Sequence, residues 1–277
     1  MARFHLGNAA AYPACMNLDL TGKRALVCGS TQGIGRAAAN LFATLGADVT
    51  LLARNVEKLK SVSAELPRTG SQAHHWVAAD FADPASVREA VRTEIKLEKP
   101  FHILINNTGG PAPGAALDAT PEQYVAGFTA HLLCNQLLVQ ALVPGMKQAK
   151  YGRIINIIST SVKQPIAGLG VSNTIRGAVA SWAKTLAGEL GPFGITVNNV
   201  LPGFTRTARL DGLIAGKVRA GAGNEEQVGA AMMAVVPMGR FAAAAEVAAA
   251  IAFLASPAAA YITGVSIAVD GGRTLAL

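Results

Sequence analysis

A serine and an arginine stand one helical turn apart in the stretch VSNTIRGAVASW, residues 171–182. Ser172 and Arg176 are four residues apart, so a helix places both side chains on one face. A hydroxyl beside a guanidinium can bind a hydroxyl or a carboxylate group, because Arg stays charged and presents several N–H donors. The same residues also fit a plain helix start, in which Ser172 caps the helix and Arg176 is solvated. The rest of the sequence must decide between these interpretations.

A glycine-rich turn, CGSTQGIG, occupies residues 28–35. It follows an apolar run and precedes an amphipathic one, as a strand-to-helix connection does. Glycines in such a turn let the backbone approach a pyrophosphate, and the helix N-terminus offers free N–H groups and a positive dipole end. The turn alone is a weak signal, because any tight strand-to-helix connection uses glycine. The residues expected to bind the phosphates of a dinucleotide are Gly29, Ser30, Gln32, Gly33, Ile34 and Gly35.

The end of the next apolar run bears on which dinucleotide binds. In folds of this kind an acid about 20 residues after the glycines binds the ribose 2′-hydroxyl of NAD. That place holds Ala53 followed by Arg54. A cation there can pair with the 2′-phosphate of NADP through a charge-assisted hydrogen bond. We therefore expect NADP as the cofactor, although an exposed basic residue in an ordinary turn would give the same sequence.

These residues require a scaffold of strands and helices. Seven short apolar runs are predicted strands, at 24–28, 49–53, 75–79, 102–106, 153–158, 195–201 and 265–269. Their nearly continuous apolar character is typical of strands buried on both faces of a parallel sheet. Predicted helices lie between them, at 34–45, 84–97, 121–148, 173–190 and 244–255. The alternation predicts an α/β, doubly wound Rossmann fold with a seven-stranded, mostly parallel sheet and helices on both faces.

The chain is predicted to form a single dinucleotide-binding domain, residues 18–277, after an N-terminal extension, residues 1–17. Met16 is an alternative to Met1 as the translation start. Residues 202–240, here called the lid segment, follow the sixth predicted strand and show neither strand periodicity nor a long uninterrupted helix. Ligands of open α/β sheets bind beyond the carboxyl ends of the strands, where this segment begins. We expect it to act as a mobile lid.

Composition limits the class of protein. The three cysteines have no metal-ligand spacing and are expected to be reduced thiols of a cytoplasmic protein without a metal site. The net charge of +7 comes from Lys and Arg that are spread along the chain, so we expect no nucleic-acid partner and an anionic cofactor or substrate. No apolar stretch reaches the roughly 20 residues of a membrane helix, so no membrane association is expected.

Together, the motifs resemble those of the short-chain dehydrogenase/reductases, especially the 3-oxoacyl-acyl carrier protein reductase-like branch. The resemblance runs from about residue 18 to 272, through the glycine turn, AAD ending at Asp80, NNTGG at 106–110, GRIINIIS ending at Ser159, GITVNNVLPG at 194–203 and ITGVSIAVDGG at 262–272. It implies that NAD(P) lies across the carboxyl edge of the sheet. The further cofactor-binding residues it implies are Asp80 near the adenine, Phe81, Asn107, and Pro202, Gly203 and Thr205 in a turn against the carboxamide.

The catalytic positions depart from the family pattern of Ser, Tyr-x-x-x-Lys and Asn. Ser159 matches the serine, but the spacing from it puts Ser172 in the place of the tyrosine and Arg176 in the place of the lysine, while His131 takes the place of the asparagine. A phenol has a pKa of about 10, whereas an aliphatic hydroxyl is a far weaker acid, and a guanidinium does not give up its proton. The residues expected at the catalytic site are Ser159, Ser172, Arg176 and His131.

Several alternatives remain open at this point. His131 either donates a proton near neutral pH or is a buried core histidine, and Lys163 is either a cation beside the substrate or a solvated loop charge. The favoured function is an NADP-dependent oxidoreductase acting on a small-molecule carbonyl or alcohol substrate with nonstandard catalytic residues. The alternative is a catalytically impaired NADP-binding protein of the same fold. The resemblance further implies a homotetramer in which subunits pair through helices 121–148 and 173–190. The sequence does not identify the substrate.

Overall fold

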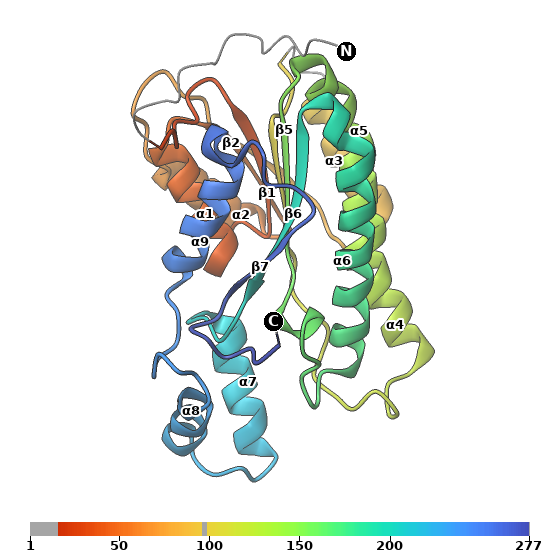
Figure 1. Ribbon diagram of the computed structural model, residues 1–277, viewed down its shortest axis with the longest axis vertical. Coiled ribbons are helices and arrows are strands. Elements are labelled where there is room, and N and C mark those ends of the chain that lie inside the picture. The colour runs from red at the N-terminus through yellow and green to blue at the C-terminus, as the bar shows by residue number, and fades with distance from the viewer. Residues whose placement is uncertain (1–15, 96–98, 277) are drawn as a thin grey trace, which may run out of the picture.

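The protein, a computed structural model describing residues 16–95 and 99–276, has the predicted Rossmann fold (Figure 1). One seven-stranded sheet has the order β3-β2-β1-β4-β5-β6-β7, and every neighbouring pair of strands is parallel. The strands are β1 Arg24–Cys28, β2 Asp48–Ala53, β3 His75–Ala78, β4 Ile103–Asn106, β5 Gly152–Ile157, β6 Ile195–Pro202 and β7 Ser266–Val269. All seven predicted strands are therefore present, in one sheet that is parallel throughout.

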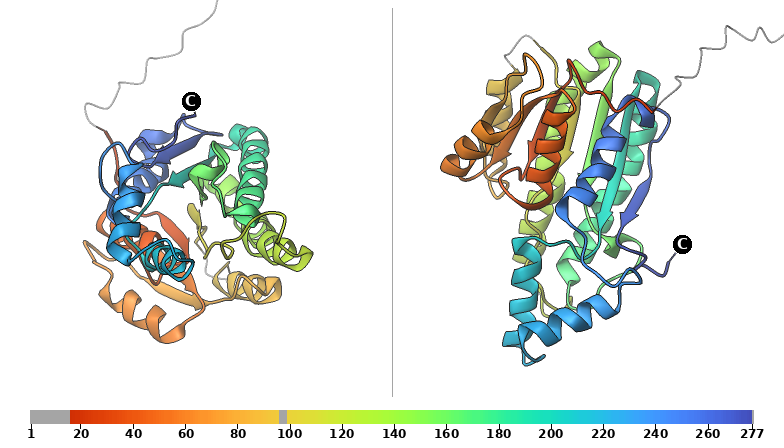
Figure 2. Two further views of the ribbon diagram at one scale, coloured as in Figure 1. Left: turned by 90° about the horizontal axis from the view of Figure 1, so that it is seen from below. Right: turned by 90° about the vertical axis from the view of Figure 1, so that its left-hand side faces the viewer.

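Helices cover both faces of the sheet (Figures 1 and 2). One face carries α1 Gly33–Thr44, α2 Val56–Glu65 and α9 Ala244–Ala255, and the other carries α3 Pro84–Ile95, α5 Cys134–Ala149 and α6 Gly170–Leu190. Alternate strand residues enter opposite cores, since Ile105 and Ile155 pack with the first set of helices and Leu104 and Ile154 with the second. Burial of both faces explains why the strand sequences are almost continuously apolar.

The predicted helix 121–148 is present but contains a break in its regular geometry. It consists of α4 Pro121–Phe128, a π-helical turn η1 Thr129–Leu133, and α5. By length and composition, Pro121–Ala149 is the one helix among the described residues that is long and apolar enough to cross a membrane, which the sequence analysis did not expect. Buried core helices meet the same criteria, and α5 contributes Leu138, Leu142 and Met146 to the core between the sheet, α3 and α6.

Helix α6 begins earlier than predicted. Its first residue is Gly170, and its N-cap is Leu169, which makes no side-chain cap hydrogen bond. Ser172 therefore lies inside the first turn, so the interpretation of Ser172 as a helix cap is wrong. Glycine is needed at 170 because a Cβ there would lie 2.4 Å from the Cα of Ala116, where the neighbouring loop runs against the helix start.

The lid segment contains two helices that the sequence analysis did not predict. They are α7 Ala208–Arg219 and α8 Glu225–Ala234, and they project beyond the carboxyl edge of the sheet (Figures 1 and 2). Leu210, Val228, Met232 and Phe241 form a small core of their own there. Glycines inside both helices weaken their local helical signal, which explains why the prediction missed them.

Three short 3₁₀ turns complete the fold: η2 Thr160–Val162, η3 Gly191–Phe193 and η4 Pro257–Ala259. Most of the predicted N-terminal extension lies outside the described residues, as does Cys15. At its end, the carbonyl of Asn17 accepts a hydrogen bond from the N–H of Ala258. Cys28 and Cys134 are buried free thiols. The division of the chain into extension, domain and mobile lid stays a prediction.

Candidate active site

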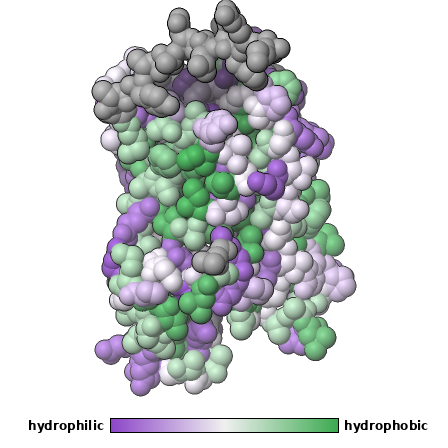
Figure 3. All heavy atoms as spheres, in the orientation of Figure 1, coloured by the Kyte–Doolittle hydropathy of each residue, from purple (hydrophilic) through white to green (hydrophobic). Residues whose placement is uncertain are grey.

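A cleft of about 730 Å³ lies at the carboxyl edge of the sheet, between the glycine turn, the ends of β2, β4, β5 and β6, and helices α6 and α7. A hollow is visible at the lower end of the molecule, between the lid helices and α4 (Figure 3). The predicted site residues that line the cleft are Gly29, Gln32, Gly33, Ile34, Arg54, Asp80, Phe81, Asn107, Ser159, Ser172, Arg176, Pro202, Gly203 and Thr205. The fold therefore brings residues from most of the length of the chain into one site.

Two of the predicted phosphate-binding residues lie beneath the cleft instead of lining it. Ser30 is fully buried, and its hydroxyl donates a hydrogen bond to the carbonyl of Leu52 at 3.3 Å, which ties the glycine turn to β2. A Cβ on Gly35 would lie 2.2 Å from the carbonyl oxygen of Gly29, so glycine at 35 allows α1 to pack closely against the turn. Both residues shape the turn, and neither lines the cleft.

The glycine turn is held in place by Asn107. Its side-chain amide donates hydrogen bonds to the carbonyls of Cys28 and Gly29, at 3.2 and 3.3 Å. Gly29 has a φ of +59°, and a Cβ there would lie 2.6 Å from the Asn107 amide nitrogen. Gly33 has a φ of +56° and lies against the methyl group of Thr207, a cleft residue that the sequence analysis did not single out. The result is half-buried glycine backbone that lines the cleft at the N-terminus of α1, an arrangement that fits a pyrophosphate.

The rim beside β2 is basic. Arg54, just after the end of β2, is exposed and lines the cleft. Lys58, from the first turn of α2, lines the same rim, and the side chain of Asn55 fixes this turn by accepting a hydrogen bond from the Lys58 N–H at 2.9 Å. Asp80 is the one acidic residue among those that line the cleft in the described chain. The rim thus offers two cations to a phosphate, and the sequence analysis found only Arg54.

Ser159 lies at the carboxyl end of β5, where the chain turns into η2. Its hydroxyl oxygen accepts a hydrogen bond from the N–H of Ser161 at 3.1 Å. Since that bond uses the oxygen as an acceptor, the hydroxyl proton stays available for donation into the cleft. Ser159 can therefore donate a hydrogen bond to a carbonyl oxygen of a bound molecule.

Arg176 is an arginine buried in the wall of the cleft. It is 8% exposed, and its Nη1 donates to the carbonyl of Ile157 at 2.8 Å, while its Nε has no partner. Burial, together with the charge of Arg209, lowers the pKa of Arg176 to about 10. The side chain is still charged at neutral pH, and within the described chain it has no carboxylate partner.

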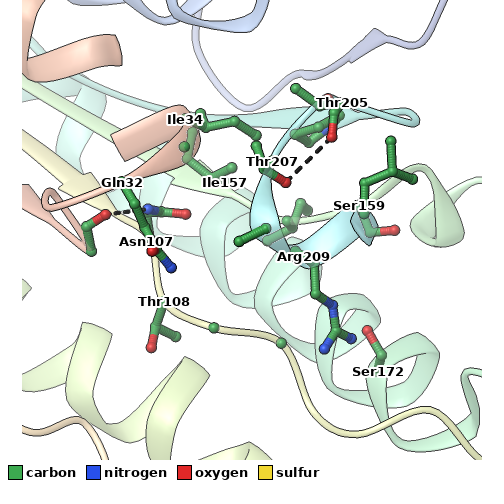
Figure 4. Close-up of a pocket in the computed structure, with 18 of the residues that line it drawn as sticks. Gln32, Ile34, Asn107, Thr108, Ile157, Ser159, Ser172, Thr205, Thr207 and Arg209 are labelled. Atoms are coloured by element: carbon green, nitrogen blue, oxygen red, sulfur yellow. Dashed lines mark hydrogen bonds between the residues drawn. The ribbon is translucent and has the colours of Figure 1, made fainter. Parts of the chain in front are cut away.

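Arg209, from the first turn of α7, is a second arginine of the cleft and was missed by the sequence analysis. Its Nη2 donates to the carbonyl of Pro111 at 2.8 Å. Figure 4 shows its guanidinium pointing toward Ser172, on the side of the site away from Gln32 and Asn107. Loss of hydration lowers the pKa of Arg209. The two ends of the cleft thus differ: one offers glycine backbone, and the other offers hydroxyls and guanidinium groups.

His131 lies in the π turn η1, and it is 2% exposed. It faces a second, adjoining cleft of about 620 Å³ and does not line the larger one. Burial, and next the charge of Arg176, lower the pKa of His131 to about 2, although a hydrogen bond to the backbone of Gly109 opposes this shift. The imidazole is therefore neutral at physiological pH, an environment that does not support the role of proton donor allowed by the sequence analysis. Lys163 is exposed and does not line either cleft.

No tyrosine lines the cleft in the part of the chain that the structure describes. The hydroxyl of Tyr151 donates to the carbonyl of Ala255 at 2.8 Å, Tyr261 is fully exposed, and Tyr124 is a partly exposed residue of α4. Tyr12 lies outside the described residues. No phenol from elsewhere in the described chain takes the place of the family's tyrosine.

Comparisons with known proteins place the chain in a family. The family described as enoyl-(acyl carrier protein) reductase matches residues 29–274. The 3-oxoacyl-[acyl-carrier-protein] reductase FabG of Rickettsia conorii is 33% identical over 258 residues, which are 93% of this chain and 99% of that protein. The NADPH-dependent reductase BacG of Bacillus subtilis is 30% identical over 251 residues, which are 90% of this chain and 97% of the relative.

A solved structure agrees with the sequence relatives. L-Sorbose reductase from Gluconobacter frateurii, complexed with NADPH and L-sorbose, superposes with a TM-score of 0.88 at 30% identity, over 95% of this chain and all of the other. Fold, motifs and relatives point to the same conclusion: this chain belongs to the short-chain dehydrogenase/reductase family of oxidoreductases.

Proposed function

We propose that this protein is an NADP-dependent oxidoreductase that interconverts a small-molecule carbonyl compound and its alcohol with nonstandard catalytic residues. The observation that carries the proposal is that one cleft has a glycine backbone and a basic rim at one end and the Ser159 and Ser172 hydroxyls at the other. The NADPH named for the sorbose reductase structure and for the Bacillus relative supports the choice of cofactor.

The residues present fit NADP. Gly29 and Gly33 line the cleft at the N-terminus of α1, where backbone N–H groups can bind the pyrophosphate, and Arg54 and Lys58 supply charge for the 2′-phosphate. Asp80 lines the cleft near the same rim, where the family places the adenine. When bound, NADPH supplies a hydride to the carbonyl carbon.

The protein's own groups must handle the charge that develops on the carbonyl oxygen. Ser159 donates a hydrogen bond to that oxygen, and Ser172 lines the same end of the cleft. The fixed positive charge of Arg176 stabilises negative charge in its surroundings, which partly replaces the missing phenol. The proton then comes from water through the serine hydroxyls. His131 binds the backbone of Gly109 and so positions the loop after β4.

Substrate-dependent oxidation of NADPH, followed at 340 nm with a panel of ketones, keto acids and 3-oxoacyl thioesters, tests the proposal. We expect turnover with at least one class, and a fall of about 10²-fold for Ser159→Ala, because one lost oxyanion donor costs this much. Lys163→Ala is the matched control, since this exposed lysine lies outside both clefts. If NADPH binds but no class is reduced, the impaired NADP-binding alternative is correct.

We further propose a cytoplasmic homotetramer. Helix α4 and the adjoining π turn expose Val125 (65%), Phe128 (39%) and Leu133 (41%), and apolar atoms are visible on the solvent-facing end of α4 (Figure 3). Such side chains are commonly covered by another subunit. Multi-angle light scattering at micromolar concentration should give four times the chain mass of 28.4 kDa. A monomeric mass would contradict this assembly.

A further inference from the structure

The substrate end of the cleft holds positive charge that the described part of the protein does not neutralise. Arg176 is more than nine-tenths buried, has one hydrogen bond to a carbonyl, and has an Nε without a partner. A buried, unpaired charge is costly, and proteins seldom keep one without a use for it. The guanidinium lines the cleft, so a bound molecule can reach it.

A second guanidinium converges on the same place. A Cβ built on Gly110 would lie 3.4 Å from the Nη2 of Arg209 and 3.6 Å from the Nη2 of Arg176. The two cations therefore flank one point on the backbone after β4, and glycine at 110 leaves that point open. Two like charges in such an arrangement repel each other, and an anion bound between them removes the repulsion. Forked guanidinium donors match the geometry of a carboxylate.

The other residues that line the cleft leave the charge of Arg176 and Arg209 available to a ligand. Asp80, the one acid among the lining residues of the described chain, belongs with Phe81 and Ala82 to the loop after β3, and it does not come from the loop after β4 that carries Gly110. The glycine turn that fits the pyrophosphate is near Gln32 and Asn107, whereas the guanidinium of Arg209 points toward Ser172 (Figure 4). The phosphates of a dinucleotide therefore have their own site, and the arginine pair lines the cleft together with the serine hydroxyls that would contact the reacting carbonyl.

We infer that the substrate is a keto acid, or the corresponding hydroxy acid, whose carboxylate is bound by Arg176 and Arg209. This inference rests on the proposed function. In the reductive direction a hydride from NADPH forms a C–H bond at the carbonyl carbon, the carbonyl π electrons pass to oxygen, and water supplies the proton that makes the hydroxyl. The keto acid is reduced to a hydroxy acid, NADPH is oxidised to NADP⁺, and the carboxylate is unchanged.

Binding of a small carboxylate tests the inference without turnover. Isothermal titration calorimetry of the NADP⁺-loaded protein compares oxamate, an anionic analogue of a 2-oxo acid, with the uncharged oxamide. We expect oxamate to bind at least tenfold more tightly, with the preference falling at high salt. Arg209→Gln should abolish the preference. Arg206→Gln removes the same charge from an exposed residue three positions earlier that does not line the cleft, and it should leave the preference intact.

Each result has one meaning. Equal affinity for oxamate and oxamide, or no detectable binding of oxamate at 10 mM, overturns the inference. A preference that survives Arg209→Gln, or one lost equally in Arg206→Gln, overturns its assignment to the arginine pair. Arg176→Lys keeps the positive charge but removes the paired N–H donors of the guanidinium. This variant should bind oxamate more weakly and still bind NADP⁺. Tight oxamate binding without reduction of any carbonyl would contradict the proposed function and leave the carboxylate site standing.

Discussion

Replacing Arg176 by Met should stabilise the protein. The folded state lowers the pKa of this guanidinium well below its ordinary value, to about 10, so the charged form, present at neutral pH, favours the unfolded chain. A shift of this size corresponds to about 3 kcal/mol. Met fills a similar volume without charge. Loss of the hydrogen bond to the Ile157 carbonyl reduces the gain in unfolding free energy by about 1 kcal/mol. The net gain of about 2 kcal/mol corresponds to a rise of about 4–8 °C in Tm.

Thermal unfolding followed by circular dichroism, at one protein concentration and without ligand, measures this effect. Arg88→Met is the matched control, because Arg88 is exposed on α3 and should leave the Tm within about 1 °C. The stabilised variant should also lose its preference for oxamate. A lower Tm for Arg176→Met than for the unmodified protein would refute the reasoning, since it would show that the guanidinium is a structural support and not a charge kept for a ligand.

Three further predictions concern the cofactor, the proton donor and the pH profile. Arg54→Ala should weaken NADPH binding by about 10- to 100-fold and leave NADH unchanged in fluorescence titrations, because only NADPH carries the 2′-phosphate; equal losses would contradict this role. Ser172→Tyr combined with Arg176→Lys should raise turnover of a neutral ketone by about 10²-fold, because a positioned phenol is a better acid; a folded, NADPH-binding double variant without any gain would contradict the inferred geometry. His131→Asn should leave the pH dependence of kcat/KM between about pH 5 and 8 unchanged, because a group with a pKa of about 2 stays neutral there; loss of an inflection would contradict its neutral state.

The sheet and the helices that cover it could be predicted because both depend on local patterns. Seven apolar runs and the helical periodicity between them are sufficient for a parallel sheet, and helix 244–255 was predicted to the residue. The π turn around His131 could not be predicted, because TAHLL has no residue that distinguishes it from an ordinary helical turn. The lid helices were missed because their burial depends on packing against each other and against Phe241.

The site shows the same division. The glycine turn and Arg54 follow each other closely in the sequence, so local spacing was enough to place them. Ser159, Ser172 and Arg176 were placed by the spacing that the family shares. Arg209 comes from the lid segment, and only the packing of α7 over the cleft brings it to within reach of Gly110. No sequence spacing indicates that Arg176 and Arg209 form a pair. The burial of Arg176, which makes its unpaired charge notable, arises only in the folded protein.

The central claim is that this protein transfers hydride despite its altered catalytic residues. The most direct test incubates the protein with NADPH that carries deuterium in the transferable position at C4, together with a panel of keto acids and neutral ketones, and measures the alcohol products by mass spectrometry. We predict an alcohol that is heavier by one mass unit, formed in proportion to the NADPH consumed and formed about 10²-fold more slowly with Ser159→Ala. Binding of NADPH without deuterium in any product would contradict the claim.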